Sequence, residues 1–568
     1  SPKMYEDALG FEFYPQINVI SHMEKGEFTD KVEGCLEKTL LILTKDESTS
    51  YAEAQGESEE GKSMGAVLPV IFLVIAVLTM VTTMHRIAAK EKTQIGTLKA
   101  LGFTDRRILR HYTSYAFVTG IIGCAIGVAL GYLIAWYIMN PNGAMGTYLD
   151  MPEWKLYLPW FCYVVVAAVI GLLTLIGFLS VKQMLRGTAA DALRPYTPKK
   201  MKNMFIERFG FFDKLSFGAK WNLRDIMRHK SRSAMSLLGV IGCMIIIVAA
   251  LGMSDTMDAF LANYYDDATK YASRIYLADD AGDEQRERIL EEYDGDWSAS
   301  VSVQLDDAAV SLDIYDTDHG FVSFPENGKG FMELGDSGAY ICRRIADENS
   351  LKVGDSFTVS PYGSSESYEL KVAGVIRSVT KNIVITPAYA ETLGISYRID
   401  SVYTLTDKAD IVQDSAIKSV QSKQMIVDSF DTFTELMDMM VVILILGAAL
   451  LGVVVLYNLG VMSYTERYRE MATLKVVGFM DRRIRGLLIG QNMWITALGV
   501  IIGLPAGIGV LNYMINELAS EYEMRLACGP KTYILSVVLT FGVSLLVSLL
   551  VSRKNKHIDM VEPFKEAE

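Results

Sequence analysis

Seven long apolar stretches constrain the fold of this chain more than any other feature of its sequence. Each is close to the ~20 residues that an α-helix needs to cross a lipid bilayer. None has Lys, Arg, Asp or Glu near its middle, where one such charge would cost about 2.5–3.5 kcal/mol. The sequence therefore predicts an α-helical polytopic membrane protein with about seven transmembrane helices. The stretches cover 66–84, 114–138, 157–181, 234–253, 439–461, 488–513 and 532–552.

The net charge of −13 is unevenly divided among the connections between these stretches. Lys and Arg outnumber Asp and Glu in 85–112, 183–233 and 463–487, and the tail opens with the basic Arg553. Short basic connections stay in the cytoplasm, so we expect these four segments, and the C-terminus, to lie inside the cell. The acidic block 254–438 and the remaining connections are expected outside.

The sequence contains an internal repeat at an offset of 376 residues. GTLKALGFTDRRILR at 96–110 and ATLKVVGFMDRRIRG at 472–486 are identical at nine of 15 positions. An offset shared by a loop and the following helix indicates a duplication.

An extracellular start without a signal peptide adds the expectation of one more helix upstream. The expected parts are 1–65, the C-terminal remnant of a first extracellular domain; 66–182, a first three-helix unit; 183–233, a cytoplasmic basic linker; 234–253, the helix that opens the second unit; 254–438, an extracellular domain; 439–552, a second three-helix unit; and 553–568, a cytoplasmic tail.

Glycines recur at a spacing of four in one helix of each unit. This spacing puts three glycines on one helix face, where a second backbone can approach closely inside a membrane. Because the pattern is repeated at the same offset, we favour a packing seam over the general glycine enrichment of membrane helices. The residues are Gly123, Gly127 and Gly131 in the first unit, and Gly499, Gly503 and Gly507 in the second.

The repeated loop TLKxxGFxDRRI is the candidate functional element. Gly102 can end a helix in the left-handed conformation, Asp105 suits the next N-cap, and a short basic helix over 106–111 is expected to follow. Such a helix is a docking surface for a soluble intracellular partner. Alternatively, the arginines only fix the topology or bind anionic membrane lipid, which leaves the repeated Gly-Phe-x-Asp unexplained. The candidate residues are Gly102, Phe103, Asp105, Arg106, Arg107 and Ile108, and Gly478, Phe479, Asp481, Arg482, Arg483 and Ile484.

Four motifs accompany the membrane stretches: QIGTLKALGF at 94–103, EMATLKVVGF at 470–479, ADALRP at 190–195 and NLRDIMRHKSRS at 222–233. Together they resemble the FtsX-like permease family, the MacB-type or type VII group of ABC transporters, over about 66–200 and 215–563. The resemblance implies a permease that couples a separate cytoplasmic ABC ATPase dimer to motion of extracellular domains. It also implies that Asp105–Leu109 and Asp481–Arg485 are the ATPase-coupling helices. Members of the family often have Glu before the first apolar pair of this loop. The second copy has Glu470 at that position, whereas the first copy has Gln94, which implies that the two ATPase contacts are unequal.

The segment 56–63 reads GESEEGKS and matches the phosphate-loop pattern G-x-x-x-x-G-K-[ST]. A working phosphate loop follows a buried strand, whereas the polar KDESTSYAEAQ precedes this one, and its own carboxylates would repel phosphate. Cys and His residues are scattered without metal-ligand spacing. The sequence therefore predicts no catalytic, cofactor-binding, metal or nucleic-acid site in this chain, and places ATP hydrolysis in a separate partner subunit.

The block 254–438 alternates between helical and β-type patterns. We expect helix within 254–290, short strands between about 300 and 405, and helix again over 410–436, which together make an α/β domain between the fourth and fifth membrane helices. The resemblance to FtsX-like permeases implies that this domain, in a bacterial cell membrane, would serve export, substrate extraction or mechanotransmission with an extracellular peptide, lipid-linked or protein substrate. The alternative is a non-transporting membrane sensor or scaffold partnered with a kinase or cell-wall enzyme. An ion-driven transporter is disfavoured because the membrane stretches lack charge.

Overall fold

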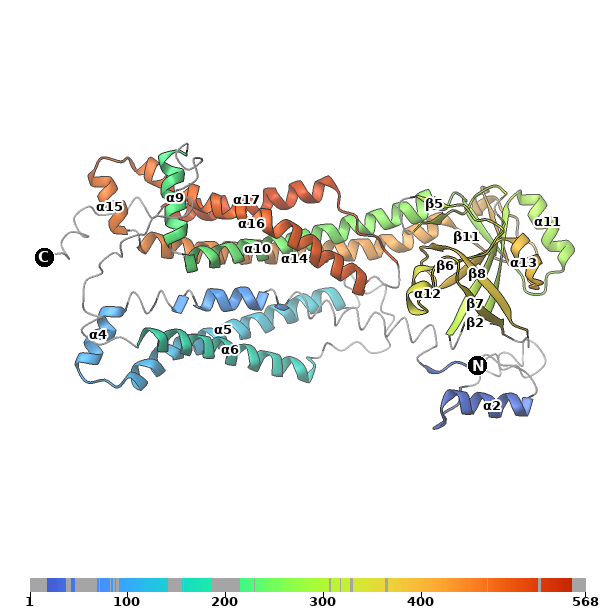
Figure 1. Ribbon diagram of the computed structural model, residues 1–568, viewed down its shortest axis with the longest axis horizontal. Coiled ribbons are helices and arrows are strands. Elements are labelled where there is room, and N and C mark those ends of the chain that lie inside the picture. Colours follow the sequence, from blue (N-terminus) through green and yellow to red (C-terminus); the bar gives the residue numbers. More distant parts are fainter. Residues whose placement is uncertain are drawn as a thin grey trace. The chain divides into compact units, whose positions relative to one another are not determined.

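The computed structural model describes residues 18–36, 42–45, 69–140, 156–185 and 215–553, apart from short gaps within these ranges. The described chain forms two compact units, a sheet unit and a helical unit (Figure 1). The sheet unit contains residues 263–425, Glu523 and the isolated helix α2 (Lys25–Leu36). The helical unit contains 69–262, 426–518 and 524–553.

The sheet unit is built on a nine-stranded sheet in the order β11-β1-β10-β2-β3-β9-β6-β8-β7. Most neighbours are antiparallel, whereas β3–β9 and β6–β8 are parallel. A further pairing of β7 with β2 joins six of the strands into a closed ring. The strands are β1 Ser273–Leu277, β2 Asp296–Leu305, β3 Ala308–Tyr315, β6 Ala339–Cys342, β7 Ser356–Pro361, β8 Tyr368–Ile376, β9 Asn382–Ile385, β10 Ser401–Thr404 and β11 Ile417–Ser422, and the separate pair β4 Phe324–Pro325 and β5 Phe331–Met332.

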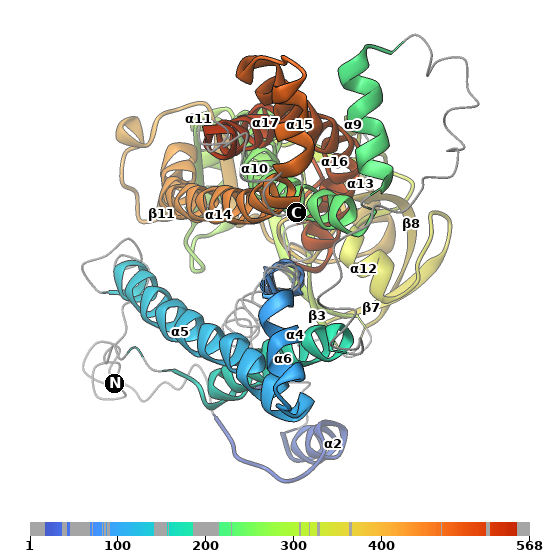
Figure 2. The same ribbon diagram turned by 90° about the vertical axis from the view of Figure 1, so that its left-hand side faces the viewer.

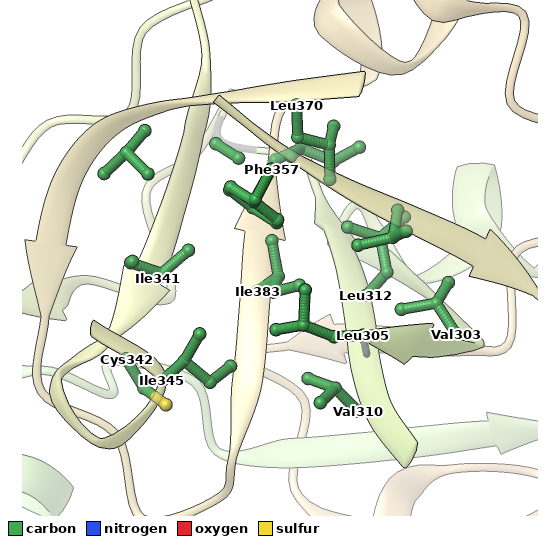
Figure 3. Packing of buried hydrophobic residues seen from close by; sticks show 14 of the residues in the cluster. Val303, Leu305, Val310, Leu312, Ile341, Cys342, Ile345, Phe357, Leu370 and Ile383 are labelled. Atoms are coloured by element: carbon green, nitrogen blue, oxygen red, sulfur yellow. The ribbon is translucent and has the colours of Figure 1, made fainter. Parts of the chain in front are cut away.

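Aliphatic side chains fill the ring, as Figure 3 shows. Leu312, Ile341, Leu370 and Ile383 are fully buried there, and they come from four different strands. Along β8 buried positions alternate with less buried ones, which is the period expected when one face of a strand packs on a core. Short helices complete the unit: α11 Asp283–Tyr293, α12 Arg343–Glu348, α13 Pro387–Leu393 and the 3₁₀ turn η4 Lys408–Asp410.

Of the two helical predictions at the edges of this domain, the first is confirmed and the second is partly wrong. The helix expected at the beginning of 254–290 is the last part of α10 (Lys230–Leu261), continued by the π-helix η3 (Ala262–Asp267), after which β1 begins. The helix expected over 410–436 begins only at Lys423, because the preceding residues form β11 and pair with β1. This pairing joins segments that are far apart in sequence, so local periodicity does not predict it.

Within the described residues, six helices are long and apolar enough to cross a membrane. The described part of the stretch predicted at 66–84 contains a shorter apolar helix, Phe72–Val81. The predicted fold class, a polytopic helical membrane protein with a domain inserted after the fourth apolar helix, is confirmed. The long helices are α5 Asp105–Met139, α6 Trp160–Met184, α10 Lys230–Leu261, α14 Lys423–Glu466, α16 Asp481–Leu518 and α17 Pro530–Ser552.

The helical unit packs around α10 in its second half and around the α5–α6 pair in its first half. The two halves meet where the Asn458 side chain donates a 2.8 Å hydrogen bond to Thr83. Three short helices, α4 (Lys92–Ala100), α9 (Phe217–Arg228) and α15 (Tyr468–Val476), lie at one end of this unit (Figure 1), and Figure 2 views the unit from that end.

Several sequence predictions fall outside the described residues. These are the GESEEGKS segment at 56–63, the ADALRP motif at 190–195, the greater part of the linker 183–233, and the tail after Arg553.

Candidate functional site

The two copies of TLKxxGFxDRRI fold into the same turn. Gly102 has φ +86° and Gly478 has φ +96°, so both adopt the left-handed conformation that favours glycine. In each copy the N–H of the following Phe donates to a carbonyl five residues back, from Phe103 to Leu98 and from Phe479 to Leu474, both at 3.0 Å. This is the Schellman arrangement that ends a helix at glycine.

The structure corrects the prediction for the next helix in two ways. Thr104 is the N-cap of α5, and Asp105 is the first helical residue rather than the cap. The expected short basic helix over 106–111 is the first part of the 35-residue α5, and the second copy likewise opens the 38-residue α16 at Asp481. The short helices are instead α4 and α15, which precede the turns.

Both turns are bridged by an equivalent ion pair. The Lys99 ammonium lies 3.0 Å from the Asp105 carboxylate, and Lys475 lies 3.2 Å from Asp481. In each pair the lysine side chain is largely buried, at 13% and 16% exposed. The carboxylate at the start of the long helix also suits the positive end of the helix dipole.

Buried apolar residues at matching positions of the two copies pack together and stabilise each turn. Ile108 packs with Ile95 in the first copy, and Ile484 packs with Met471 in the second. Ile108 and Ile484 are 3% and 2% exposed, so these two predicted contact residues are core residues that anchor the turn.

The outer side of each turn combines exposed apolar and basic side chains. Leu101 and Val477 occupy the same repeat position and are each 70% exposed. All four arginines after the turns are also exposed; they are Arg106, Arg107, Arg482 and Arg483. Phe103 is exposed, whereas Phe479 is half-buried and lies 6.3 Å between ring centroids from Phe217 of α9. Apolar groups exposed on a fixed turn are typical of an interaction surface.

Helix α9 distinguishes the second copy. Arg228 of α9 lies 3.0 Å from Glu470 of α15, and Gln491 of α16 donates a 2.8 Å hydrogen bond to the buried Asp225 of α9. Sequence reasoning noted the NLRDIMR motif but did not assign this role to it. In the first copy the repeat equivalents of Glu470 and Gln491 are Gln94 and Tyr115, and the uncharged Gln94 cannot form the ion pair that Glu470 makes.

The glycine seams differ between the halves. A Cβ built on Gly503 would lie 2.8 Å from Cβ of Met244, and Gly499 and Gly507 approach α10 equally closely. Here side chains of α10 pack directly against the glycine backbone of α16, which lets the two helices approach closely. For Gly123, Gly127 and Gly131, no described atom lies within 4 Å of a Cβ position.

The fold and the repeated turns define a polytopic membrane protein with two equivalent helical halves. The family model of the FtsX-like permease C-terminal region matches this chain at residues 66–189 and 442–560, one match in each half. Each half of the chain therefore contains a region that is similar to the C-terminal region of FtsX-like permeases.

Other comparisons add little. No curated protein matches the chain significantly in sequence. The crystal structure of the periplasmic region of MacB from Actinobacillus actinomycetemcomitans aligns over 30% of this chain and 98% of its own length, at 10% identity and a TM-score of 0.20. A likeness at this TM-score carries no structural argument.

Proposed function

We propose that a separate cytoplasmic ABC ATPase dimer docks on the two repeated turns and drives this permease. Closure of the dimer on ATP pushes on both turns, and the long helices that begin there carry the movement toward the sheet unit on the other side of the membrane. The movement serves export, extraction of a lipid-linked or peptide substrate, or activation of an external protein. The C-terminus and the basic connections lie in the cytoplasm.

The observation that carries this proposal is the duplicated geometry of the turn. Left-handed glycine, ion pair, buried isoleucine and exposed arginines all recur at an offset of 376 residues. A topology signal or a lipid contact needs only positive charge, whereas a dimeric partner needs two rigid surfaces of the same shape. The rigidity follows from the continuous helix that begins at each turn.

The two docking contacts are unequal in this proposal. The second turn is braced by α9 through the Arg228–Glu470 pair, and the first turn has Gln94 at the position of Glu470. An ATPase subunit on the second turn therefore meets the more rigid surface.

The test is purification of the chain from its native membrane, with mass spectrometry and an ATPase assay on the purified complex. We expect a stoichiometric soluble subunit with a working phosphate loop. The subunit should be lost when the four exposed arginines are changed to Glu, and retained in a control with Lys352→Glu and Lys371→Glu, which reverses two exposed charges of the sheet unit. Stable chain without any ATPase subunit would overturn the proposal and favour the scaffold alternative.

A further inference from the structure

Glu523 lies in the connection between α16 and α17, yet it belongs to the sheet unit. Its side chain is only 2% exposed. Its backbone has φ +48°, a left-handed conformation that few residues other than glycine adopt. Such a conformation persists where surrounding contacts hold it in place.

Those contacts use every acceptor of the residue. One carboxylate oxygen accepts a 2.8 Å hydrogen bond from the N–H of Arg344, at the start of α12. The other accepts a 2.9 Å hydrogen bond from the N–H of Ser378, just after β8. The guanidinium of Arg377 donates a 2.6 Å hydrogen bond to the main-chain oxygen of Glu523. The guanidinium Nε of Arg344 also lies 3.4 Å from the carboxylate.

A buried carboxylate is stable only when it is paired and hydrogen-bonded. Here two backbone N–H groups and the guanidinium of Arg344 provide that environment, and hydrogen bonds to an ionised acceptor are the stronger ones. The geometry fits glutamate specifically, because glutamine has one acceptor oxygen and could satisfy only one of the two N–H groups.

The other end of the same connection is fixed within the helical unit. The N–H of Ala527 donates a 3.3 Å hydrogen bond to the hydroxyl oxygen of Thr256 in α10, and the N–H of Gly529 donates a 2.6 Å bond to Asp255. Only residues 524–526 separate these contacts from the buried carboxylate. Four Cα–Cα steps span at most about 14 Å, so this part of the chain has little slack.

We propose that Glu523 is a latch through which the α16–α17 connection holds and moves the sheet unit. The movement rests on the function proposed above. Helix α16 begins at Asp481, directly after the second turn, and its 38 residues extend for about 57 Å before the connection that carries the latch. A push on that turn thus reaches the sheet unit along one continuous helix, in addition to the routes through α10 and α14. Glu523 is a positioning residue in this scheme.

The first comparison tests the latch without any ATPase. Hydrogen exchange is measured by mass spectrometry on the full chain over 343–348 and 377–381. In Glu523→Gln, we expect at least one of the amides of Arg344 and Ser378 to exchange about 10- to 100-fold faster than in the unaltered chain. Glu369→Gln, which changes an exposed glutamate on β8, should leave exchange unchanged. Equal exchange in the two variants would overturn the latch.

The second comparison tests the movement in the complex with the ATPase. We expect ATP to change exchange over 343–348 and 377–381, and we expect this response to fall at least about 5-fold in Glu523→Gln while ATP hydrolysis continues. A second variant inserts Gly-Gly-Ser between Arg525 and Leu526; it keeps the carboxylate contacts but adds slack, and should lose the response equally. An unchanged response in both variants would overturn the proposal. If no ATPase co-purifies, the proposed function fails, and the first comparison alone decides the latch.

Discussion

Replacing Gly478 with alanine should increase the population of molecules in which the second turn is unfolded. The residue has φ +96°, and no atom of the described residues lies within 4 Å of the position that a Cβ would occupy. The substitution therefore creates no steric clash with a neighbour, and its whole effect comes from the backbone conformation. A left-handed backbone costs an L-residue with a Cβ about 1–2 kcal/mol, which multiplies the population of the opened turn by about 5–30.

The assay is hydrogen exchange of the Phe479 amide, which donates to Leu474 across the turn. We expect this amide to exchange about 5- to 30-fold faster in Gly478→Ala, and less so in Gly478→Asn, because asparagine tolerates the left-handed region better. Gly486→Ala is the matched control: this glycine lies inside α16 with open space around it, so alanine should leave the turn closed. Equal exchange in Gly478→Ala and Gly486→Ala would refute the reasoning.

Three further predictions concern packing, pairing and pH. Gly503→Ala should destabilise the chain by about 1–3 kcal/mol in thermal unfolding, because its Cβ would meet α10; Gly127→Ala should change little, and equal effects would contradict the seam. A double-mutant cycle on Arg228 and Glu470 should give a coupling of about 0.2–1 kcal/mol, since both side chains are partly exposed; zero coupling would show that this ion pair does not contribute to the bracing of the turn by α9. The Ala416 N–H donates a hydrogen bond to Asp414 and holds the pKa of this carboxyl group below its usual range. The stabilisation that Asp414 gives the folded chain is therefore present at pH values above its pKa in the unfolded chain, and it is lost as the pH falls. Asp414→Asn should therefore lower the melting temperature at pH 7, by a difference that shrinks below about pH 4, and a pH-independent difference would contradict this assignment.

The membrane helices and the two turns could be predicted from sequence because their signals are local. An uncharged apolar stretch of bilayer length has few other solutions. Gly102 and Gly478 follow a short helical pattern at the same offset, and glycine is the usual residue where a helix ends in the left-handed conformation. The N-cap was misplaced by one residue because Asp105 fits both the cap and the first helical turn, and its pairing with Lys99 depends on how the turn folds.

The braces and the latch could not be predicted because they join distant parts of the chain. Arg228 and Glu470 are 242 residues apart, and Ser378 and Glu523 are 145 apart. No local periodicity records such a pairing: Glu470 belongs to the repeated motif, but the motif does not indicate its partner, and no motif includes Glu523. Strand β11 was missed for the same reason, since its polar sequence becomes a strand only beside β1.

Site-specific photo-crosslinking in native membranes tests the central claim most directly. A benzophenone side chain is placed at Leu101 or Val477, each 70% exposed on a turn, and at Leu450, which is 66% exposed on the membrane helix α14. The account predicts an adduct with a soluble ATPase subunit from both turn positions and none from Leu450. Turn positions that form no ATPase adduct, in membranes where the chain is intact, would contradict it.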